Sequence, residues 1–148
     1  MLKTLRIEDY AIIENLEVEF STGLNILTGS TGVGKSILIG ALSLVLGERA
    51  DSGLIRTGAS YSVVEAIFEV KKNSPLTVFL QDESLFNQEN SVIIRREISS
   101  KGGGKNFVND KIVALSTLKS IGDFLVDLHG QHQHQSLLDS KKHFDFLD

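Results

Sequence analysis

Residues 29 to 36 read Gly29-Ser30-Thr31-Gly32-Val33-Gly34-Lys35-Ser36, a complete G-x-x-x-x-G-K-S phosphate loop. Its glycines let backbone N–H groups turn inward around phosphate oxygens without Cβ clashes. In such a loop the lysine reaches the terminal phosphates and the last serine hydroxyl ligates Mg²⁺. The run therefore predicts a site for a nucleoside triphosphate with Mg²⁺.

The segments on either side of this loop support the same interpretation. Leu24–Leu27 is a short apolar strand pattern, and Ile37–Leu46 is an almost unbroken apolar run of helical length, closed by Gly47 as a C-cap. This order puts the loop at the N-terminus of a helix. Unpaired N–H groups and the helix macrodipole favour an anion there.

Composition restricts the classes of protein that the chain can belong to. The 148 residues are enough for one domain, and there are no cysteines, which excludes disulfides, thiolate catalysis and cysteine-based zinc sites. No apolar run is long enough to span a bilayer, and the first residues lack the apolar core of a signal peptide. We expect a cytoplasmic protein.

Charge gives no indication of a nucleic-acid footprint. The net charge is −4 at pH 7, whereas a nucleic-acid surface is typically basic. Short basic pairs occur at Lys71-Lys72, Arg95-Arg96 and Lys141-Lys142. We expect each pair to be a solvated face and not a phosphate-binding track.

Hydrophobic patterns predict strands before and after the loop. They place two strands in residues 2 to 20, joined near Tyr10-Ala11-Ile12, and further strands at 61 to 70, 91 to 99, 106 to 108 and 125 to 128. Helices are expected at 75 to 80, 113 to 124 and 136 to 147. Because strands and helices do not alternate strictly, we expect a mixed sheet with an antiparallel lobe and not a doubly wound sheet.

Hydrolysis requires more than a phosphate loop, because an acidic residue on a neighbouring strand must hold Mg²⁺. The best candidate is Asp127, after Phe124-Leu125-Val126, but the run has three apolar residues where four are usual and no second acid follows. Asp127 is either this acid, in a self-contained small P-loop NTPase, or a residue that ends a strand beside a polar loop. The sequence also has no Ser-Gly-Gly signature of ABC-type ATPases.

A cluster of histidines and glutamines follows Asp127, in the run His129-Gly130-Gln131-His132-Gln133-His134-Gln135. It can be a histidine metal site, a solvated loop, or a glutamine loop near the γ-phosphate. The glutamine loop is the favoured interpretation. An amide offers both a donor and an acceptor to Mg²⁺ and water without adding charge.

Several segments resemble the SMC-like ATPases. The similarity is carried by Leu5-Arg6-Ile7 with the acidic strand after it, by residues 23 to 29 with the phosphate loop, and by Leu46-Gly47-Glu48-Arg49-Ala50. The run from His129 to Leu138 is similar to the RecN family, the bacterial SMC-like proteins of DNA double-strand break repair. The phosphate loop is generic, whereas the His-Gly-Gln-His segment is far more specific.

The chain departs from the family pattern at three places. Ser30 stands where the family commonly has Glu, and Val33 stands where it has Ala. Because the loop works through backbone N–H groups, binding should survive both differences. The turn at 101 to 105, Lys-Gly-Gly-Gly-Lys, has more glycine and less arginine than the family suggests, which puts any contact of that turn with DNA or nucleotide in doubt.

The resemblance implies an α/β P-loop NTPase fold, the N-terminal lobe of an ABC-type head that a coiled coil separates from its C-terminal half. Two such heads would sandwich two ATP molecules in DNA repair and recombination, in the cytoplasm at the nucleoid. The missing signature and magnesium acid would lie in the C-terminal half. This chain alone would then be a nucleotide-binding module without turnover.

The resemblance also assigns roles to residues. Gly29 to Ser36 would bind ATP, with Lys35 and Gln131 as catalytic groups and with Ser36 and Gln131 at Mg²⁺. Gln133 and His129 are alternatives to Gln131. Arg56 matches an arginine near phosphate or DNA in SMC heads, or it is a surface residue of a loop.

Overall fold

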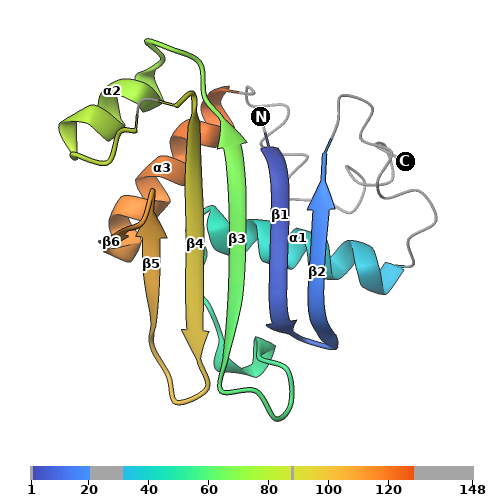
Figure 1. Ribbon diagram of the computed structural model, residues 1–148. Helices are drawn as coiled ribbons and strands as arrows, with labels where there is room; N and C mark the ends of the chain where they lie inside the picture. The colour runs from blue at the N-terminus through green and yellow to red at the C-terminus, as the bar shows by residue number, and fades with distance from the viewer. Residues whose placement is uncertain (1, 21–31, 88, 129–148) are drawn as a thin grey trace.

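A six-stranded sheet organises the part of the chain that this computed structural model describes, residues 2–20, 32–87 and 89–128 (Figure 1). The strand order is β2-β1-β3-β4-β5-β6, and each of these neighbouring pairs is antiparallel. The strands are β1 (Leu2–Tyr10), β2 (Ile13–Glu19), β3 (Tyr61–Glu69), β4 (Ser91–Ser99), β5 (Gly104–Val108) and β6 (Lys111–Val113). The antiparallel lobe is thereby confirmed, while the strand expected at 24 to 27 lies outside the described residues.

In the described residues, three α-helices accompany the sheet: α1 (Gly32–Val45), α2 (Pro75–Asp82) and α3 (Leu115–Leu128). A short 3-10 helix, η2 (Ser52–Leu54), follows α1. Helices α1 and α3 lie behind the sheet in Figure 1, where α1 contacts β3 and β4 and α3 contacts β5. In the described ranges, no helix has the length and apolar character needed to cross a membrane.

Strict alternation along the strands explains why one face of the sheet is the core. In β4 the residues Val92, Ile94, Arg96 and Ile98 are buried, whereas their neighbours along the strand are partly exposed. Successive side chains of a strand point to opposite faces. The buried set therefore faces the helices, together with Ile7 of β1 and Val64 of β3, which are fully buried.

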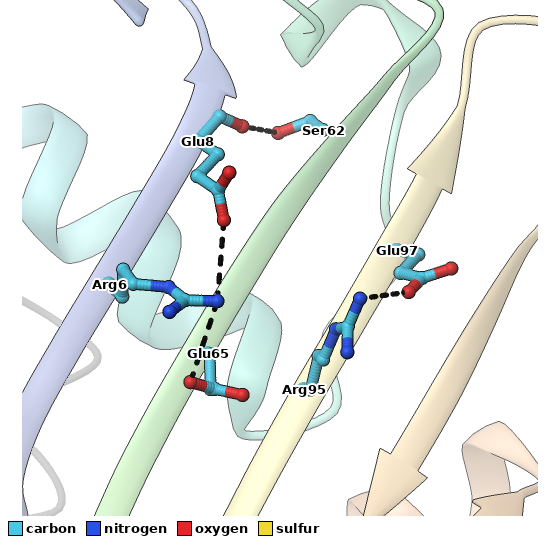
Figure 2. Close-up of polar contacts among 6 residues, drawn as sticks. All are labelled: Arg6, Glu8, Ser62, Glu65, Arg95 and Glu97. Carbon is cyan, nitrogen blue, oxygen red and sulfur yellow. Dashed lines mark hydrogen bonds and ion pairs between the residues drawn. The ribbon is translucent and has the colours of Figure 1, made fainter. Parts of the chain in front are cut away.

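The opposite face of the sheet carries charged side chains (Figure 2). Arg6 lies between two acids, with its Nη2 atom 3.4 Å from Glu8 Oε2 and 3.9 Å from Glu65 Oε1. Arg95 pairs with Glu97 at 2.5 Å on β4. Such half-exposed ion pairs contribute little to stability, so the core on the other face holds the sheet together.

The helix expected at Pro75 is confirmed, and a tight turn lies between β5 and β6. Pro75 begins α2, and the Ser74 Oγ atom accepts a hydrogen bond from the N–H of Thr77 at 3.3 Å as an N-cap. Asn109 and Asp110 join β5 to β6, with φ values of +49° and +70°. Positive φ at both central residues is what a tight two-residue hairpin requires.

Two sequence-based assignments near the end of the described chain are wrong. Residues 125 to 128 are the last turn of α3 and not a strand, and the expected helix does not begin at Val113, because that residue ends β6. The buried residues Leu118, Ile121 and Leu125 continue one helical stripe. A four-residue apolar run cannot distinguish a strand from a helix end by periodicity alone.

The expectation that the Arg95-Arg96 pair is a solvated face is also wrong for Arg96. Only Arg95 lies on the charged face, whereas Arg96 is on the core face and is 6% exposed. Burial lowers the pKa of Arg96 from its ordinary value. Val92, Ile94 and Ile98 alternate with polar or partly exposed positions, and Arg96 falls in the same alternating set. This pattern is the signal in the sequence that places Arg96 on the core face.

Candidate functional site

The N-terminus of α1 lies within the phosphate-loop motif. The helix begins at Gly32, five residues before the apolar run that predicted it, so the motif residues 32 to 36 form its first turn. No acidic residue occurs in this turn, and the Ser36 side chain is exposed. A helix N-terminus without a carboxylate suits a polyanion, because its free N–H groups and the macrodipole both attract negative charge.

The remaining predicted site residues are described in part or not at all. For Gly32, Val33, Gly34 and Lys35 the backbone is helical, and their side chains are not described. Gly29, Ser30 and Thr31 lie outside the described residues, as do Gln131 and its alternatives Gln133 and His129. The structure therefore gives the helical half of the phosphate loop.

The body of α1 packs into the core and fixes the direction in which its N-terminus points. Ile37, Leu38, Ala41, Leu42 and Val45 are all at most 9% exposed. Burying such a stripe contributes about 1.5 to 3 kcal/mol for each large side chain. Residues 32 to 36 of the motif therefore lie on a helix that packs against β3 and β4.

A tyrosine from the first hairpin contacts the middle of α1. Tyr10, at the end of β1, is 4% exposed, and a Cβ atom built on Gly40 would lie only 2.5 Å from its Oη atom. Burial raises the pKa of Tyr10 above its ordinary value of 10.0. Sequence patterns placed Tyr10 near the join of the first two strands, but they did not indicate that its hydroxyl approaches Gly40.

The C-terminus of α1 is closed by Gly47, as predicted. Gly47 has φ +104°, its N–H donates to Leu44 O at 3.1 Å, and the Glu48 N–H donates to Ser43 O at 3.1 Å. These two bonds form a Schellman motif, which glycine allows because it tolerates the left-handed conformation. The C-terminal end of α1 is therefore capped by backbone hydrogen bonds.

This C-terminal end also packs closely against α3. A Cβ atom on Gly47 would lie 2.6 Å from the Cα atom of Lys119, and one on Gly122 would overlap the carbonyl oxygen of Leu46. Only glycine permits such an approach of two backbones. The end of α1 is therefore in contact with the helix that precedes the His-Gly-Gln segment in the chain.

Arg56 follows η2 and lies beside the turn between β1 and β2. Its N–H donates to Asp9 O at 2.8 Å, and its Nη1 atom is 3.8 Å from Asp9 Oδ1. The neighbouring Leu54 carbonyl accepts from Ala11 N–H at 2.7 Å, so the segment pairs with the β1–β2 turn. The Arg56 side chain is 42% exposed. Within the described residues, no hydrogen bond or ion pair joins it to Ser36.

Asp127 does not follow a strand. It belongs to the last turn of α3, and its side chain is not described. The magnesium-holding acid of phosphate-loop enzymes lies on a strand beside the loop strand. The backbone around Asp127 lacks this geometry.

Comparison with known proteins agrees with this architecture. A sequence model described as "AAA domain" matches residues 4–147. The DNA repair protein RecN of Bacillus subtilis (strain 168) is 38% identical over 148 residues, and RecN of Halalkalibacterium halodurans is 41% identical over 150 residues. Each match covers 100% of this chain and 26% of the relative, so the chain spans about a quarter of the length of these relatives.

Solved structures show the same fold at lower identity. A chain from work on "ATP-driven dimerization and DNA stimulated activation of SMC ATPases" has a TM-score of 0.66 and 20% identity, covering 99% of this chain and 96% of that one. The Smc head of Pyrococcus yayanosii has a TM-score of 0.61 and 20% identity, over 83% of this chain and 25% of that one. A structure of the recombination mediator protein RecF, described as RecF-ATPrS, has a TM-score of 0.58 and 16% identity, covering 80% of this chain and 29% of that one.

The sequence and the fold thus lead to one assignment. The family match spans nearly the whole chain, the RecN relatives align with all of it, and the structural neighbours are SMC and RecF ATPase heads. The chain therefore belongs to the AAA domain family, as a RecN-like member that shares the fold of the SMC heads.

Proposed function

We propose that residues 1–148 form the N-terminal part of an ABC-type, SMC-like ATPase head and bind ATP with Mg²⁺. The observation that carries the proposal is the start of α1 at Gly32, inside the G-x-x-x-x-G-K-S motif. The first N–H groups of a helix have no partner within the helix, and in α1 they belong to residues of the motif. The buried apolar stripe of α1 holds them in one direction.

In this proposal the residues of the loop divide the task of binding. Backbone N–H groups of residues 29 to 34 would donate to phosphate oxygens, and Lys35 would reach the terminal phosphates. The Ser36 hydroxyl would ligate Mg²⁺, which neutralises charge between the phosphates. Gln131 would hold Mg²⁺ and the attacking water, with Gln133 and His129 as alternatives, and Arg56 would lie near phosphate or DNA.

The longer protein that contains such a head would act in repair of DNA double-strand breaks and in recombination. The RecN relatives are DNA repair proteins by name, and one structural neighbour comes from work on ATP-driven dimerization of SMC ATPases. The partners would be the C-terminal half of the same head, a second head across the nucleotide, and DNA. The proposed location is the cytoplasm, at the nucleoid.

The chain alone should bind ATP without turning it over. Turnover by a self-contained small NTPase would need Asp127 at a strand end, and the helical backbone of residues 115 to 128 counts against that alternative. Steady-state hydrolysis that is abolished by Asp127→Ala would restore it.

The test is calorimetric titration of the chain with MgATP. Lys35→Ala should remove measurable binding, because one ammonium group that meets the terminal phosphates is lost. Lys72→Ala is the matched control, since Lys72 is exposed in the turn between β3 and α2 and should leave the affinity unchanged. Equal affinity of both variants would mean that the loop does not bind the phosphates.

A further inference from the structure

Arg96 connects the phosphate-loop helix to the hairpin formed by β4 and β5. Its Nη1 atom donates to Leu44 O at 2.8 Å and also to Glu48 O, and its Nε atom donates to Asn106 Oδ1 at 3.0 Å. Leu44 is in the last turn of α1, Glu48 follows that helix, and Asn106 lies on β5. One guanidinium group on β4 therefore connects the end of α1, the segment just after it and β5.

The contact meets an electrostatic need at the end of α1. The last turn of this helix contains no basic residue, although the C-terminal end of a helix dipole carries partial negative charge. Helix-end carbonyls that are buried without a donor are costly. Arg96 supplies the missing cation from β4, with a second donor to Leu44 O beside the N–H of Gly47 and a donor to Glu48 O, and the helix end is thereby attached to the sheet.

The anchored C-terminal end of α1 controls the position of its N-terminal end, because α1 is a single helix of 14 residues. Such a helix is about 20 Å long, so a tilt of about 3° at one end moves the other by about 1 Å. Displacements of this size are large compared with the tolerance of a preorganised site. The contacts of Arg96 therefore affect the position of residues 32 to 36 at the other end of the helix.

We propose that Arg96 is a positioning residue for triphosphate binding: it anchors the end of α1 and thereby sets the orientation of the phosphate loop at the other end. This inference rests on the proposed function and adds a determinant of affinity outside the motif. The planar guanidinium is required, since it holds the helix carbonyls and Asn106 together.

The adjacent Arg95 provides a matched control. It has the same chemistry on the same strand but points to the opposite face, where it pairs with Glu97 at 2.5 Å and lies 5.6 Å from the centre of the Phe107 ring (Figure 2 shows the pair with Glu97). Its contacts do not involve α1. Removal of Arg95 tests the loss of one arginine from β4 without loss of the anchor.

The experiment compares MgATP affinity among Arg96→Met, Arg95→Met and the unsubstituted chain, at a temperature where each is fully folded. Arg96→Met keeps a long apolar side chain but no donor. Its affinity for MgATP should fall about tenfold. This is the factor that corresponds to the loss of about one charge-assisted hydrogen bond from the anchor of α1. Arg95→Met should stay within about twofold of the unsubstituted chain, because exposed ion pairs contribute little. Hydrogen exchange of α1 should rise in Arg96→Met alone.

A purely structural role would lower the unfolding midpoint of Arg96→Met and leave the affinity of the folded protein unchanged, and that result would overturn the inference while MgATP binding itself stands. Absence of binding in the unsubstituted chain would instead refute the proposed function. If Arg96→Met does not fold, Arg96→Lys carries the test. Lysine keeps the charge but not the planar fork, so affinity should fall about threefold, and unchanged affinity would overturn the inference.

Discussion

At its N-terminal end α1 begins inside a glycine-rich motif, whereas at its C-terminal end it stops against α3 and β4. The first end has no acidic residue in its turn and an exposed Ser36. The second end has a Schellman motif at Gly47, a close approach to Gly122 and the buried donor Arg96. One helix therefore has an end whose first N–H groups have no partner within the helix and an end whose backbone carbonyls accept further hydrogen bonds.

The difference indicates how a site made largely of main-chain groups can keep its shape. Backbone N–H groups have no side-chain rotamers to lock, so their direction depends on the helix that carries them. In this chain the helix is held by its buried stripe and by contacts at its far end. Changes at the anchored end test whether binding depends on that attachment.

The largest effect is expected at Gly122, where α3 crosses the end of α1. Gly→Ala inside a helix usually stabilises by about 1 kcal/mol. Here the new Cβ atom would overlap the carbonyl oxygen of Leu46, and a backbone atom cannot move as a side-chain tip can. Gly122→Ala should therefore destabilise the fold by about 2 to 3 kcal/mol, measured by urea unfolding.

The control for this variant is Asp123→Ala, at the next position of the same helix, where the side chain is exposed. Surface substitutions of this kind are usually within about 0.5 kcal/mol of neutral. If both variants unfold at the same urea concentration, the close crossing of α1 and α3 is not a determinant of stability.

A smaller effect with a change of sign is expected in the middle of α1. Gly40→Ala places a Cβ atom 2.5 Å from Tyr10 Oη but 3.7 Å from Tyr10 Cζ. The variant should lose about 1 to 2 kcal/mol alone. In a Tyr10→Phe background the overlap disappears, and alanine should gain up to about 1 kcal/mol through helix propensity.

This double-mutant cycle is measured by thermal unfolding of the four proteins. Additive effects would show that the hydroxyl of Tyr10 does not limit position 40, since only residues in contact couple. If the two substitutions together are less destabilising than the sum of their separate effects, Tyr10 of β1 contacts α1 at position 40.

Most of the fold could be predicted from the sequence because its elements follow simple periods. Apolar and alternating patterns predicted strands in the ranges of β1, β2, β3 and β4, and the helix expected at 75 to 80 begins at Pro75 as α2. The prediction failed at 125 to 128, where a short apolar run after a helical stripe fits two conformations. It also missed β6, which is only three residues long.

The site could be predicted only where the chemistry is local. The eight-residue motif predicted where a phosphate loop would lie in the chain, and the apolar run after the motif predicted the helix. The anchors of that helix come from residues distant in sequence: 52 positions separate Arg96 from Leu44, and the contacts at Gly40 and Gly122 depend on the packing of separate elements. No periodicity within one segment encodes such approaches.

The smallest predicted effect concerns ionisation of Tyr10, which reports burial beside α1. Burial raises its pKa above the ordinary value of 10.0, so the folded state binds this proton more tightly than the unfolded state. The stability that Tyr10 contributes is then complete below about pH 10 and is lost as pH rises through the pKa of the folded state.

The measurement uses a Tyr61→Phe chain, in which Tyr10 is the single tyrosine. Its tyrosinate absorbance should appear only above about pH 10. Above about pH 10 this chain should also lose more stability than the Tyr10→Phe chain, because only the Tyr61→Phe chain retains the buried hydroxyl. Ionisation at the ordinary value would place the Tyr10 hydroxyl in water, away from Gly40.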